Sequence, residues 1–430
     1  MYDARAEAMS VDERSALQEK RLRTLVDRLL VLGGVQGQRL RAAGVDSGAE
    51  VSLAGLSRLP TTSKSDLWET YPFGLLAVAR EDVVAVHGSS GTGGRPTLVG
   101  YTRADLDLWA EVVARSLGCA GARAGTVVHN AYGYGLFTGG IGFHLGGIRM
   151  GATVVPMSGG MTQRQLTLIA DLRPEVLTCT PSYAVTLGEA AAAAGSDVSS
   201  LRAGIFGAEP WSEAMRAQIQ SVLPLKALDV YGLSEVIGPG VATECIEAQS
   251  GLHVNEDHFV VECVDPSTGE PVPDGEPGEL VFTTPTKEAL PLLRYRSGDI
   301  ASLDRGTCEC GRTLVRMSKV LGRRDDMLVV RGVNVYPSEV ESVLLAREGL
   351  APHYVLVVDR RAPVVELIVC CEAASDAGAH RTAIVYALHE RLGLRADVRV
   401  LAPGTLPRQE VGKAVRVVTW SDGEPPVPGL

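Results

Sequence analysis

Short apolar strands alternate with helices between residues 127 and 230, and this alternation limits the possible folds more than any other feature of the chain. The pattern predicts strands at residues 127–130, 175–180, 201–206 and 226–230, separated by helices at residues 163–172, 183–194 and 212–223. Apolar strands joined through helices form parallel sheets that are covered by helices. Ligands of such folds bind at the carboxyl ends of the strands. The loops that follow these strands are therefore the places to search for a functional site.

The regions on either side of this segment have different sequence patterns. Residues 1–45 are predicted to be helical, because leucines recur there at helical spacing. After about residue 255 the chain is β-like, and a turn at residues 265–269 predicts a smaller antiparallel sheet or barrel. For a chain of 430 residues we expect more than one domain. The expected fold class is α/β, with a large N-terminal domain of parallel sheets plus a small β-rich subdomain (1–324), followed by a small α+β C-terminal domain (325–430).

Composition excludes several classes of function. The net charge is −10, which argues against a nucleic-acid binder held by phosphate contacts. No apolar run is long enough to span a bilayer, and the N-terminal stretch has no apolar signal segment, so no membrane partner and a cytoplasmic location are expected. Eight cysteines in a chain of this length do not predict a disulfide framework.

Residues 87–97, His-Gly-Ser-Ser-Gly-Thr-Gly-Gly-Arg-Pro-Thr, directly follow a short apolar strand. Glycines let a backbone approach an anion closely, amide and hydroxyl groups can then surround phosphate oxygens, and Arg95 adds a positive charge. No Gly-Lys-Ser/Thr closes the run, so it is not a Walker A loop. Taken alone, the run is equally typical of a flexible surface turn. Lys64 opens a short helix; its side chain is long enough to reach a phosphate, but a solvated surface lysine is the favoured interpretation.

Further motifs favour the interpretation of residues 87–97 as a phosphate-binding loop over that of a surface turn. Asp229-Val-Tyr-Gly-Leu-Ser-Glu235 follows a strand; Tyr231 offers a flat face to a purine, and Glu235 offers a hard oxygen ligand to Mg²⁺. In Tyr295-Arg-Ser-Gly-Asp299, the carboxylate can accept hydrogen bonds from ribose hydroxyls and Arg296 can hold an α-phosphate. Three other motifs are Gly207-Ala-Glu-Pro-Trp211, Gly322-Arg-Arg-Asp-Asp-Met327 and Pro407-Arg-Gln-Glu-Val-Gly-Lys413. Each of them alone can be a turn, a helix cap or a surface ion pair.

As an ordered set, these motifs resemble the adenylate-forming superfamily, and most closely its phenylacetate–coenzyme A ligase branch. Tyr132-Gly-Tyr-Gly-Leu-Phe-Thr-Gly-Gly140 and Asp325-Asp-Met-Leu-Val-Val-Arg-Gly-Val-Asn-Val-Tyr-Pro337 are especially specific, and the resemblance runs from about residue 50 to Lys413. It implies that a carboxylate attacks the α-phosphate of ATP, releases pyrophosphate, and forms an acyl-adenylate that a thiol, usually that of coenzyme A, then attacks. Catalysis of this kind depends on positioning and on charge stabilisation.

The resemblance also implies roles for individual residues. Lys413, Glu235 and Arg296 are the implied catalytic residues, with Lys413 bridging the attacking carboxylate and the α-phosphate and Glu235 holding Mg²⁺. The implied nucleotide and coenzyme A site comprises Ser89, Ser90, Gly91, Thr92, Arg95, Glu209, Pro210, Asp229, Tyr231, Gly232, Ser234, Asp299, Arg331 and Gly332. The C-terminal domain is implied to be a mobile lid that rotates about Asp325 between the two half-reactions.

The implied acyl pocket is mostly apolar and aromatic, with room left by small residues, and a flat aromatic acid fits it best. Its expected lining is Tyr132, Phe137, Gly207, Ala208, Ile237 and Pro239. Tyr132 is equally explained as ordinary core packing.

Four other residues suggest a metal site. Cys245 and His253 form a C-x7-H pair, and Cys308 and Cys310 form a tight C-x-C turn. Three thiolates and one imidazole suit tetrahedral zinc, although the spacing is not that of a standard zinc finger. The alternative is two unrelated pairs of reduced thiols, and His258 is an alternative imidazole ligand. We expect a structural Zn²⁺ that does not take part in the chemistry.

The sequence therefore predicts an ATP-dependent, Mg²⁺-dependent ligase that joins an aromatic carboxylic acid, arylacetic or aryl, to coenzyme A. A rival interpretation is an adenylating enzyme that loads a carrier protein or passes the acyl group to an amine. A third is a non-catalytic nucleotide-binding homologue, because Gly93 and Arg95 depart from the usual Ser-Ser-Gly-Thr-Thr-Gly-Lys-Pro-Thr run. A homodimer is common in this branch and is a further expectation.

Overall fold

The computed structural model describes residues 1–89, 96–324, 327–330, 333–361, 365–394, 396–408, 413–428 and 430. Several predicted functional residues lie outside this part of the chain. They are Ser90, Gly91, Thr92 and Arg95 of the phosphate loop, the hinge residue Asp325, and the pair Arg331 and Gly332.

The N-terminal segment is helical, as predicted. Its helices are α1 (Ala4–Glu7), α2 (Val11–Leu32) and α3 (Val35–Ala42), followed by short 3-10 turns at Gly48–Glu50, Leu53–Arg58 and Arg80–Asp82 and by α4 (Lys64–Glu69). Ser10 caps α2 in a reciprocal arrangement with Glu13. The inward stripe of α2, which includes Leu22 and Leu25, packs against Leu293 of the main body. No helix among the described residues combines the length and the apolar character needed to cross a bilayer.

A nine-stranded sheet forms the centre of the molecule, in the order β13-β14-β9-β8-β7-β6-β5-β3-β4. Its parallel half consists of β4 (Thr153–Val155), β3 (Val127–Asn130), β5 (Val176–Cys179), β6 (Ala203–Gly207) and β7 (Lys226–Leu233). Its antiparallel half consists of β8 (Gly238–Glu244), β9 (Leu252–Val254), β14 (Arg316–Met317) and β13 (Leu303–Asp304). The predicted parallel arrangement of the first half is confirmed.

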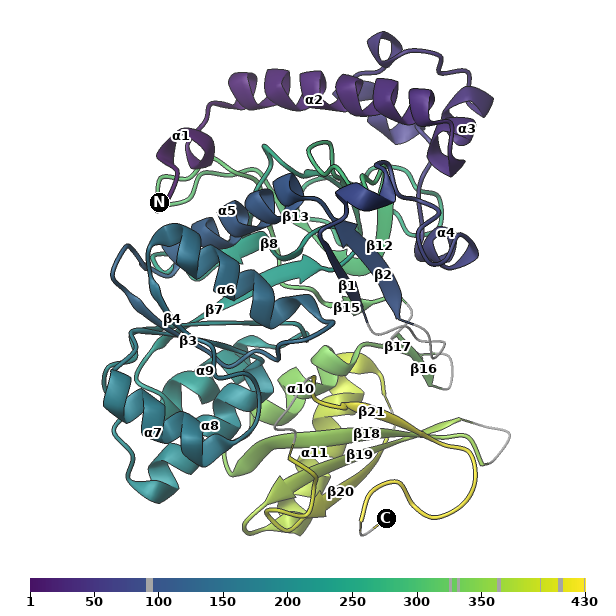
Figure 1. Cartoon of the computed structure of the whole chain (residues 1–430). Helices are drawn as coiled ribbons and strands as arrows, with labels where there is room; N and C mark the ends of the chain where they lie inside the picture. Colours follow the sequence, from purple (N-terminus) through teal and green to yellow (C-terminus); the bar gives the residue numbers. More distant parts are fainter. Residues whose placement is uncertain are drawn as a thin grey trace.

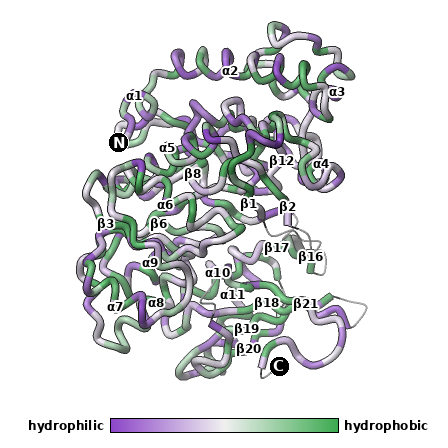
Figure 2. The backbone as a smooth tube through the Cα atoms, viewed as in Figure 1, coloured by the Kyte–Doolittle hydropathy of each residue, from purple (hydrophilic) through white to green (hydrophobic). Residues whose placement is uncertain are grey.

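Helices cover both faces of this sheet (Figure 1). On one side lie α5 (Arg103–Cys119) and α6 (Thr138–Met150), and on the other lie α7 (Thr162–Leu172), α8 (Pro181–Ala194) and α9 (Glu213–Val222). Successive residues of β5 enter different cores, since Val176 packs with the α5 side and Leu177 packs with the α7–α9 side. Figure 2 shows the deep green of hydrophobic residues at the start of β3, whose sequence is Val-Val-His-Asn.

A second, four-stranded antiparallel sheet confirms the predicted β-rich region. It consists of β10 (Val260–Val264), β11 (Gly278–Thr283), β12 (Tyr295–Ala301) and β15 (Gly322–Arg323). A separate hairpin of β1 (Ala85–Ser89) and β2 (Thr97–Tyr101) flanks the predicted phosphate loop. The predicted phosphate loop therefore connects two paired strands.

The C-terminal part has its own sheet and its own core. It contains β16 (Leu328–Val330), β17 (Val333–Val335), α10 (Pro337–Leu345), β18 (Leu350–Asp359), β19 (Glu366–Ala373), α11 (Ala377–Leu392), β20 (Asp397–Leu401) and β21 (Val417–Trp420). The sheet order is β20-β19-β18-β21, and α10 and α11 pack on it through Val340, Ile384 and Leu388. Figure 1 shows this part below the nine-stranded sheet, with α10 beside α9. The boundary at residue 325 stays a prediction.

Candidate active site

The turn that follows strand β7 carries Glu235, which is almost fully buried. Its Oε1 atom accepts a hydrogen bond of 2.8 Å from the hydroxyl of Ser89, the last residue of β1. The hydroxyl of Ser234 donates to the main-chain oxygen of Gly88 at 3.2 Å and strengthens the same junction. The start of the predicted phosphate loop and the predicted Mg²⁺ ligand therefore lie side by side, although 146 residues separate Ser89 from Glu235.

Lys64 does not have the solvated position that the sequence analysis expects, and that interpretation is wrong. Its Nζ atom lies 3.5 Å from Glu235 Oε1, and only 25% of its side chain is exposed. The ammonium group also lies 5.8 Å from the ring centre of Trp68. A cation held there meets any anion that binds beside Glu235. A single lysine at the start of a short helix forms no sequence pattern from which its contact with Glu235 could be predicted.

Asp299, at the predicted ribose position on β12, is held by two donors. The hydroxyl of Tyr231 donates to Oδ2 at 2.6 Å, and Arg323 donates to Oδ1 at 3.1 Å. Burial raises the pKa of Tyr231 well above its ordinary value, so its hydroxyl remains a donor. The ring of Tyr231 stacks on Phe282 with centroids 5.8 Å apart. Arg323 is a site residue that the sequence analysis missed, although it belongs to the quoted Gly322–Met327 motif.

Arg296 lies elsewhere. Its guanidinium group forms an ion pair with Glu279 and donates to the main-chain oxygen of Pro266 at 2.7 Å. These partners differ from Tyr231 and Arg323, which hold Asp299, and an irregularity of the β11–β12 pairing separates residue 296 from residue 300. Its predicted contact with the α-phosphate would require this ion pair to break.

Glu209 connects the main body to the C-terminal part. Its Oε1 accepts a hydrogen bond from the amide of Ser182 at 2.9 Å, and its Oε2 accepts one from the amide of Ala414 at 2.7 Å. Lys413 precedes Ala414 and is exposed. Gly207 ends the strand before Glu209, and a Cβ atom there would lie 2.2 Å from the main-chain oxygen of Val230. Only glycine therefore lets this loop pass so close to β7.

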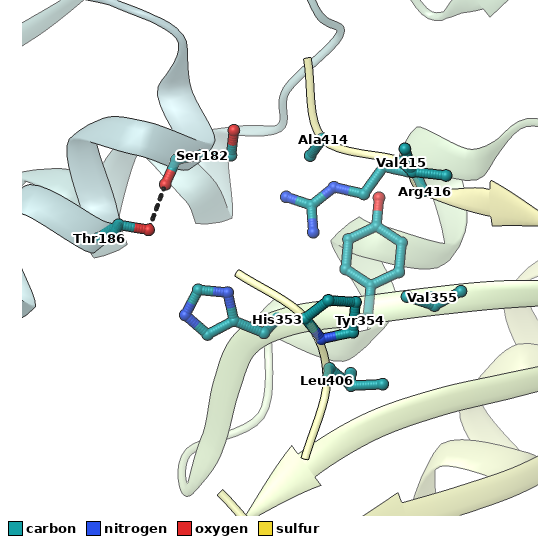
Figure 3. A pocket seen from close by; sticks show the side chains of 10 residues that line it. Ser182, Thr186, His353, Tyr354, Val355, Leu406, Ala414, Val415 and Arg416 are labelled. Atoms are coloured by element: carbon teal, nitrogen blue, oxygen red, sulfur yellow. Dashed lines mark hydrogen bonds between the residues drawn. The ribbon is translucent and has the colours of Figure 1, made fainter. Parts of the chain in front are cut away.

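Other polar contacts fasten the same interface. Glu341 on α10 accepts hydrogen bonds from the amide of Ser212 at 2.9 Å and from the hydroxyl of Tyr354 at 3.1 Å. Beside them lies a cavity of about 40 Å³. Figure 3 shows Ser182 of α8 on one side of this cavity and Tyr354 and Arg416 of the C-terminal part on the other. The interface is thus packed and polar rather than open.

The residues predicted to line the acyl pocket are brought together only in part. Tyr132 is buried and stacks on Phe143, with centroids 5.4 Å apart and planes 4° from parallel. Ile237 belongs to the same buried cluster. Pro239 is half-buried, and its main-chain oxygen accepts a hydrogen bond from Trp109 at 3.0 Å. Phe137, in contrast, is 56% exposed at the start of α6. The other two predicted lining residues, Gly207 and Ala208, lie at the end of β6.

Asp229, a predicted nucleotide-site residue, lies buried in β7 near two charged side chains. Burial raises the pKa of its carboxyl group to about 7, with a further rise from Glu244 and an opposing effect from Lys319. The amide of Asp229 donates to Glu244 Oε2 at 2.7 Å. The carboxyl group is therefore poised to titrate near neutral pH.

We expect Asp229→Asn to flatten the dependence of stability on pH. The folded protein holds the Asp229 proton up to a higher pH than the unfolded chain, so the free energy of unfolding falls as the pH rises from about 4 to about 7. Each pKa unit corresponds to about 1.4 kcal/mol. Between pH 5 and pH 8 the melting temperature of the wild-type protein should fall by a few degrees more than that of the variant. The exposed Asp274→Asn serves as a control, and parallel curves for D229N and wild type would contradict the expectation.

The four predicted metal ligands lie together. The donor atoms of Cys245, His253, Cys308 and Cys310 are all within 4.8 Å of one another. The sulfur atoms of Cys245 and Cys308 are 3.7 Å apart, and Cys310 Sγ lies 3.5 Å from His253 Nε2. Strand β9, the residue that follows β8 and the 308–310 turn thus gather three thiols and one imidazole, which fits the donor set of tetrahedral zinc.

His258, the alternative ligand, is not part of this group. It lies 3.1 Å from Asp257 and 3.8 Å from Glu111. Arg115 pairs with both carboxylates, at 2.8 Å and 2.5 Å. These three acidic and imidazole side chains therefore form an ion-pair network around an arginine.

The N-terminal helix reaches the cysteine and histidine group. Glu7 of α1 pairs with Arg312 at 2.6 Å, and both side chains are almost completely buried. Arg312 follows Cys310 by two residues, so α1 packs directly on the turn that carries two of the four ligands. A buried ion pair of this kind fixes position more than it adds stability.

Comparison with known proteins places these features in context. Residues 18–287 match the family model for the AMP-binding enzyme, and residues 332–419 match that for the AMP-binding enzyme C-terminal domain. The chain is 50% identical to the phenylacetate-coenzyme A ligase of Thermus thermophilus, over 97% of this chain and 99% of that protein.

Solved structures resemble the whole molecule. A 2-hydroxyisobutyryl-CoA ligase in the postadenylation state, in complex with R3-HIB-AMP, has a TM-score of 0.89 at 28% identity, covering 96% of this chain and 91% of that one. The same ligase with 2-HIB-AMP and CoA in the thioesterification state covers the same shares of both chains, but its TM-score is only 0.72. The two parts of this chain are thus arranged more as in the postadenylation state.

Proposed function

The chain belongs to the AMP-binding enzyme family, within the phenylacetate–coenzyme A ligase branch, and from this premise we propose that its substrate is an arylacetic acid of the phenylacetate type. The reaction is ATP-dependent activation of the acid to an acyl-adenylate, followed by thioester formation with coenzyme A. The enzyme is an AMP-forming acid–thiol ligase.

In our proposal the side chains divide the first half-reaction between them. Glu235 is the ligand for Mg²⁺, which supplies charge neutralisation to the phosphates when bound, and Ser89 lies beside it at 2.8 Å. Asp299 accepts hydrogen bonds from the ribose hydroxyls, supported by Arg323 at 3.1 Å. Lys413 stabilises the negative charge that develops between the attacking carboxylate and the α-phosphate.

The observation that carries this proposal is the bond of 2.7 Å between Glu209 and the amide of Ala414. Glu209 follows β6, one of the strands whose carboxyl ends form the expected ligand edge of the sheet. Ala414 is the residue next to Lys413. A lysine from the C-terminal part is thereby held next to the loop that is proposed to line the adenine, which adenylate formation requires.

The second half-reaction is proposed to follow a rotation of the C-terminal part. Support comes from the difference in TM-score between the two states of the 2-hydroxyisobutyryl-CoA ligase, 0.89 and 0.72. Asp325 is the proposed hinge, and Arg331 and Gly332 are proposed to face the thiol; these three residues lie outside the described part of the chain. The contacts of Glu209 and Glu341 across the interface would break during the rotation.

Pyrophosphate release against a panel of aromatic acids, with and without coenzyme A, tests the proposal. We expect release that depends on an arylacetic acid and accelerates when coenzyme A is present. Release that ignores coenzyme A would favour a carrier protein or an amine as the acceptor. If no acid of the panel gives pyrophosphate release but calorimetry shows nucleotide binding, a non-catalytic homologue would be favoured.

A structural zinc ion is a separate part of the proposal. Cys245, His253, Cys308 and Cys310 would hold it, and the support is that their donor atoms lie within 4.8 Å of one another. All four coordination positions would be filled by protein, as in structural rather than catalytic zinc sites. The ion would tie the antiparallel half of the nine-stranded sheet to the 308–310 turn, on which α1 packs.

A further inference from the structure

Lys287, in the loop between β11 and β12, is a buried lysine that the chemistry described so far does not use. It is 1% exposed, and its Nζ atom donates to the main-chain oxygen of Glu235 at 3.0 Å. Nζ also lies 4.9 Å from the ring centre of Tyr101. Burying an ammonium group is costly unless its charge and its protons are compensated. A position that tolerates this cost calls for an explanation beyond packing.

The turn of residues 234–237 is held from the inside of the protein. The hydroxyl of Tyr101 lies 3.3 Å from the main-chain oxygen of Ser234 and 3.0 Å from that of Ile237. Together with Lys287 on the oxygen of Glu235, the single hydroxyl hydrogen of Tyr101, which lies nearest to the oxygen of Ile237, holds this turn from the protein interior. The main chain of the turn is therefore fixed by Tyr101 and Lys287.

The side chain of Glu235 makes different contacts. Its carboxylate meets the hydroxyl of Ser89 at 2.8 Å and the ammonium group of Lys64 at 3.5 Å. Ser89 ends β1, which leads into the predicted phosphate loop. Lys64 begins α4, which packs beside β2, the strand that follows this loop. Lys287 thus holds the backbone of the residue whose carboxylate is presented to the phosphates.

Asp105 anchors the loop that carries Lys287. This fully buried carboxylate accepts hydrogen bonds from the amides of Glu288 at 2.6 Å and Ala289 at 2.8 Å. It also caps the start of α5 through the amide of Thr102 at 3.0 Å. Burial lowers the pKa of Lys287 to about 8, while the charges of Asp105 and Glu235 oppose that shift, so the side chain remains mostly an ammonium ion at neutral pH.

We propose that Lys287 is a positioning residue, which together with Tyr101 fixes the turn of residues 234–237 so that the Glu235 carboxylate is presented to the divalent cation of the nucleotide. The proposal rests on the proposed function, because it assigns Lys287 to the cation site of that reaction. Lys287 acts through Glu235 and touches neither the cation nor the phosphates. An apolar residue of similar length would fill the same space, but it would leave the Glu235 carbonyl without its donor.

Two measurements test this inference. Mn²⁺ is titrated into enzyme saturated with a non-hydrolysable ATP analogue and followed by electron paramagnetic resonance, and pyrophosphate release is measured against Mg²⁺ concentration. For Lys287→Met we expect Mn²⁺ to bind at least about 10-fold more weakly, and the Mg²⁺ concentration for half-maximal rate to rise by a similar factor. Lys287→Arg keeps the charge and the donors, and it should stay within about threefold of wild type.

Lys226→Met is the matched control. Lys226 also donates to a main-chain oxygen, that of Ile246 at 3.1 Å, but it lies on the exposed start of β7. Wild-type Mn²⁺ binding and Mg²⁺ dependence in K287M would overturn the proposal, as would a fall in rate with no change in either metal constant. If K287M does not fold, Tyr101→Phe decides between the outcomes: weaker Mn²⁺ binding supports the proposal and unchanged binding overturns it.

Failure of the proposed function would look different. A wild-type protein that binds Mn²⁺ with the nucleotide but releases no pyrophosphate with any arylacetic acid would contradict the proposed reaction. The difference in Mn²⁺ affinity between K287M and wild type would still report on Lys287.

Discussion

Lys413→Ala should lower acid-dependent pyrophosphate release by at least about 100-fold, the effect typical of removing one preorganised group that stabilises transition-state charge. Lys413 is exposed, so its truncation should leave the fold intact. Thioester formation from a supplied acyl-adenylate should stay within about threefold of wild type, because that step no longer involves attack on the α-phosphate. The two half-reactions are measured separately, and circular dichroism checks the fold.

Arg381→Ala is the control for the Lys413 variant. Arg381 is a cation of the same C-terminal part, but it lies on α11 and pairs with Asp397 in an exposed position. It should leave both half-reactions unchanged. A full rate of pyrophosphate release in K413A would move the charge-stabilising role to another residue, with Lys64 the first candidate, since it lies 3.5 Å from Glu235.

Cys308→Ser should remove zinc and destabilise the protein by at least about 3 kcal/mol, because binding free energy at a structural site is folding free energy. Protein purified without added zinc should contain about one zinc ion per chain, and the variant about none. The cluster joins Cys245, which follows β8, and His253 of β9 to the 308–310 turn, so its loss should also loosen α1. Metal analysis and thermal unfolding measure the two effects.

Cys263→Ser controls for the change of sulfur to oxygen. Cys263 lies outside the cluster and donates to the main-chain oxygen of Ala301 at 3.2 Å, a contact that serine can keep. This variant should retain zinc and lose little stability. A zinc-to-protein ratio near zero in the wild-type protein would refute the metal site and leave the four residues as reduced side chains in contact.

The core of the fold could be predicted from the sequence because its strands carry short apolar runs, such as Val127-Val128 and Val176-Leu177, and alternate with helices. The strands predicted at 127–130, 175–180 and 201–206 correspond to β3, β5 and β6, and the helices predicted at 163–172, 183–194 and 212–223 correspond to α7, α8 and α9 to within about two residues at each end. The motif residues lie in or directly after other strands, namely β1, β7 and β12, and the resemblance grouped them. Ser89 with Glu235, and Tyr231 with Asp299, are in hydrogen-bond contact.

Helix α6 could not be predicted from its own residues. It carries a high share of glycine, and glycine is a weak helix former. The reason for these glycines lies in the partner helix: a Cβ atom at Gly146 would lie 2.6 Å from Cβ of Val113 on α5, and one at Gly142 would lie 2.8 Å from the ring of Trp109. Close packing of α5 against α6 explains the many glycines of α6. The sequence of α6 alone does not show which helix packs against it.

For a similar reason Lys287 could not be predicted as a site residue, and Lys64 was considered as a phosphate contact but a surface position was favoured. Neither belongs to a motif, and each reaches Glu235 from a different element of the fold. Burial is what distinguishes Lys287 from the other lysines, and burial follows from tertiary packing. Arg323 differs from both lysines, because it belongs to the Gly322–Met327 motif. Only its contact with Asp299 could not be predicted.

The ion pair between Glu7 and Arg312 has a consequence for the order of events on the ribosome. The two residues are 305 positions apart, and α2 and α3 likewise depend on late partners: Arg14 pairs with Glu256, and Gln36 donates to Pro291. At about 5–20 residues per second, roughly 15–60 s separate the synthesis of Glu7 from that of Arg312. During this interval the apolar stripe of α2 has only its local partners, such as Leu40 and Leu56, and lacks Val260 and Leu293, which complete its cover. The part of the stripe that faces these late residues is therefore open to chaperones on the nascent chain and closed to them in the finished protein.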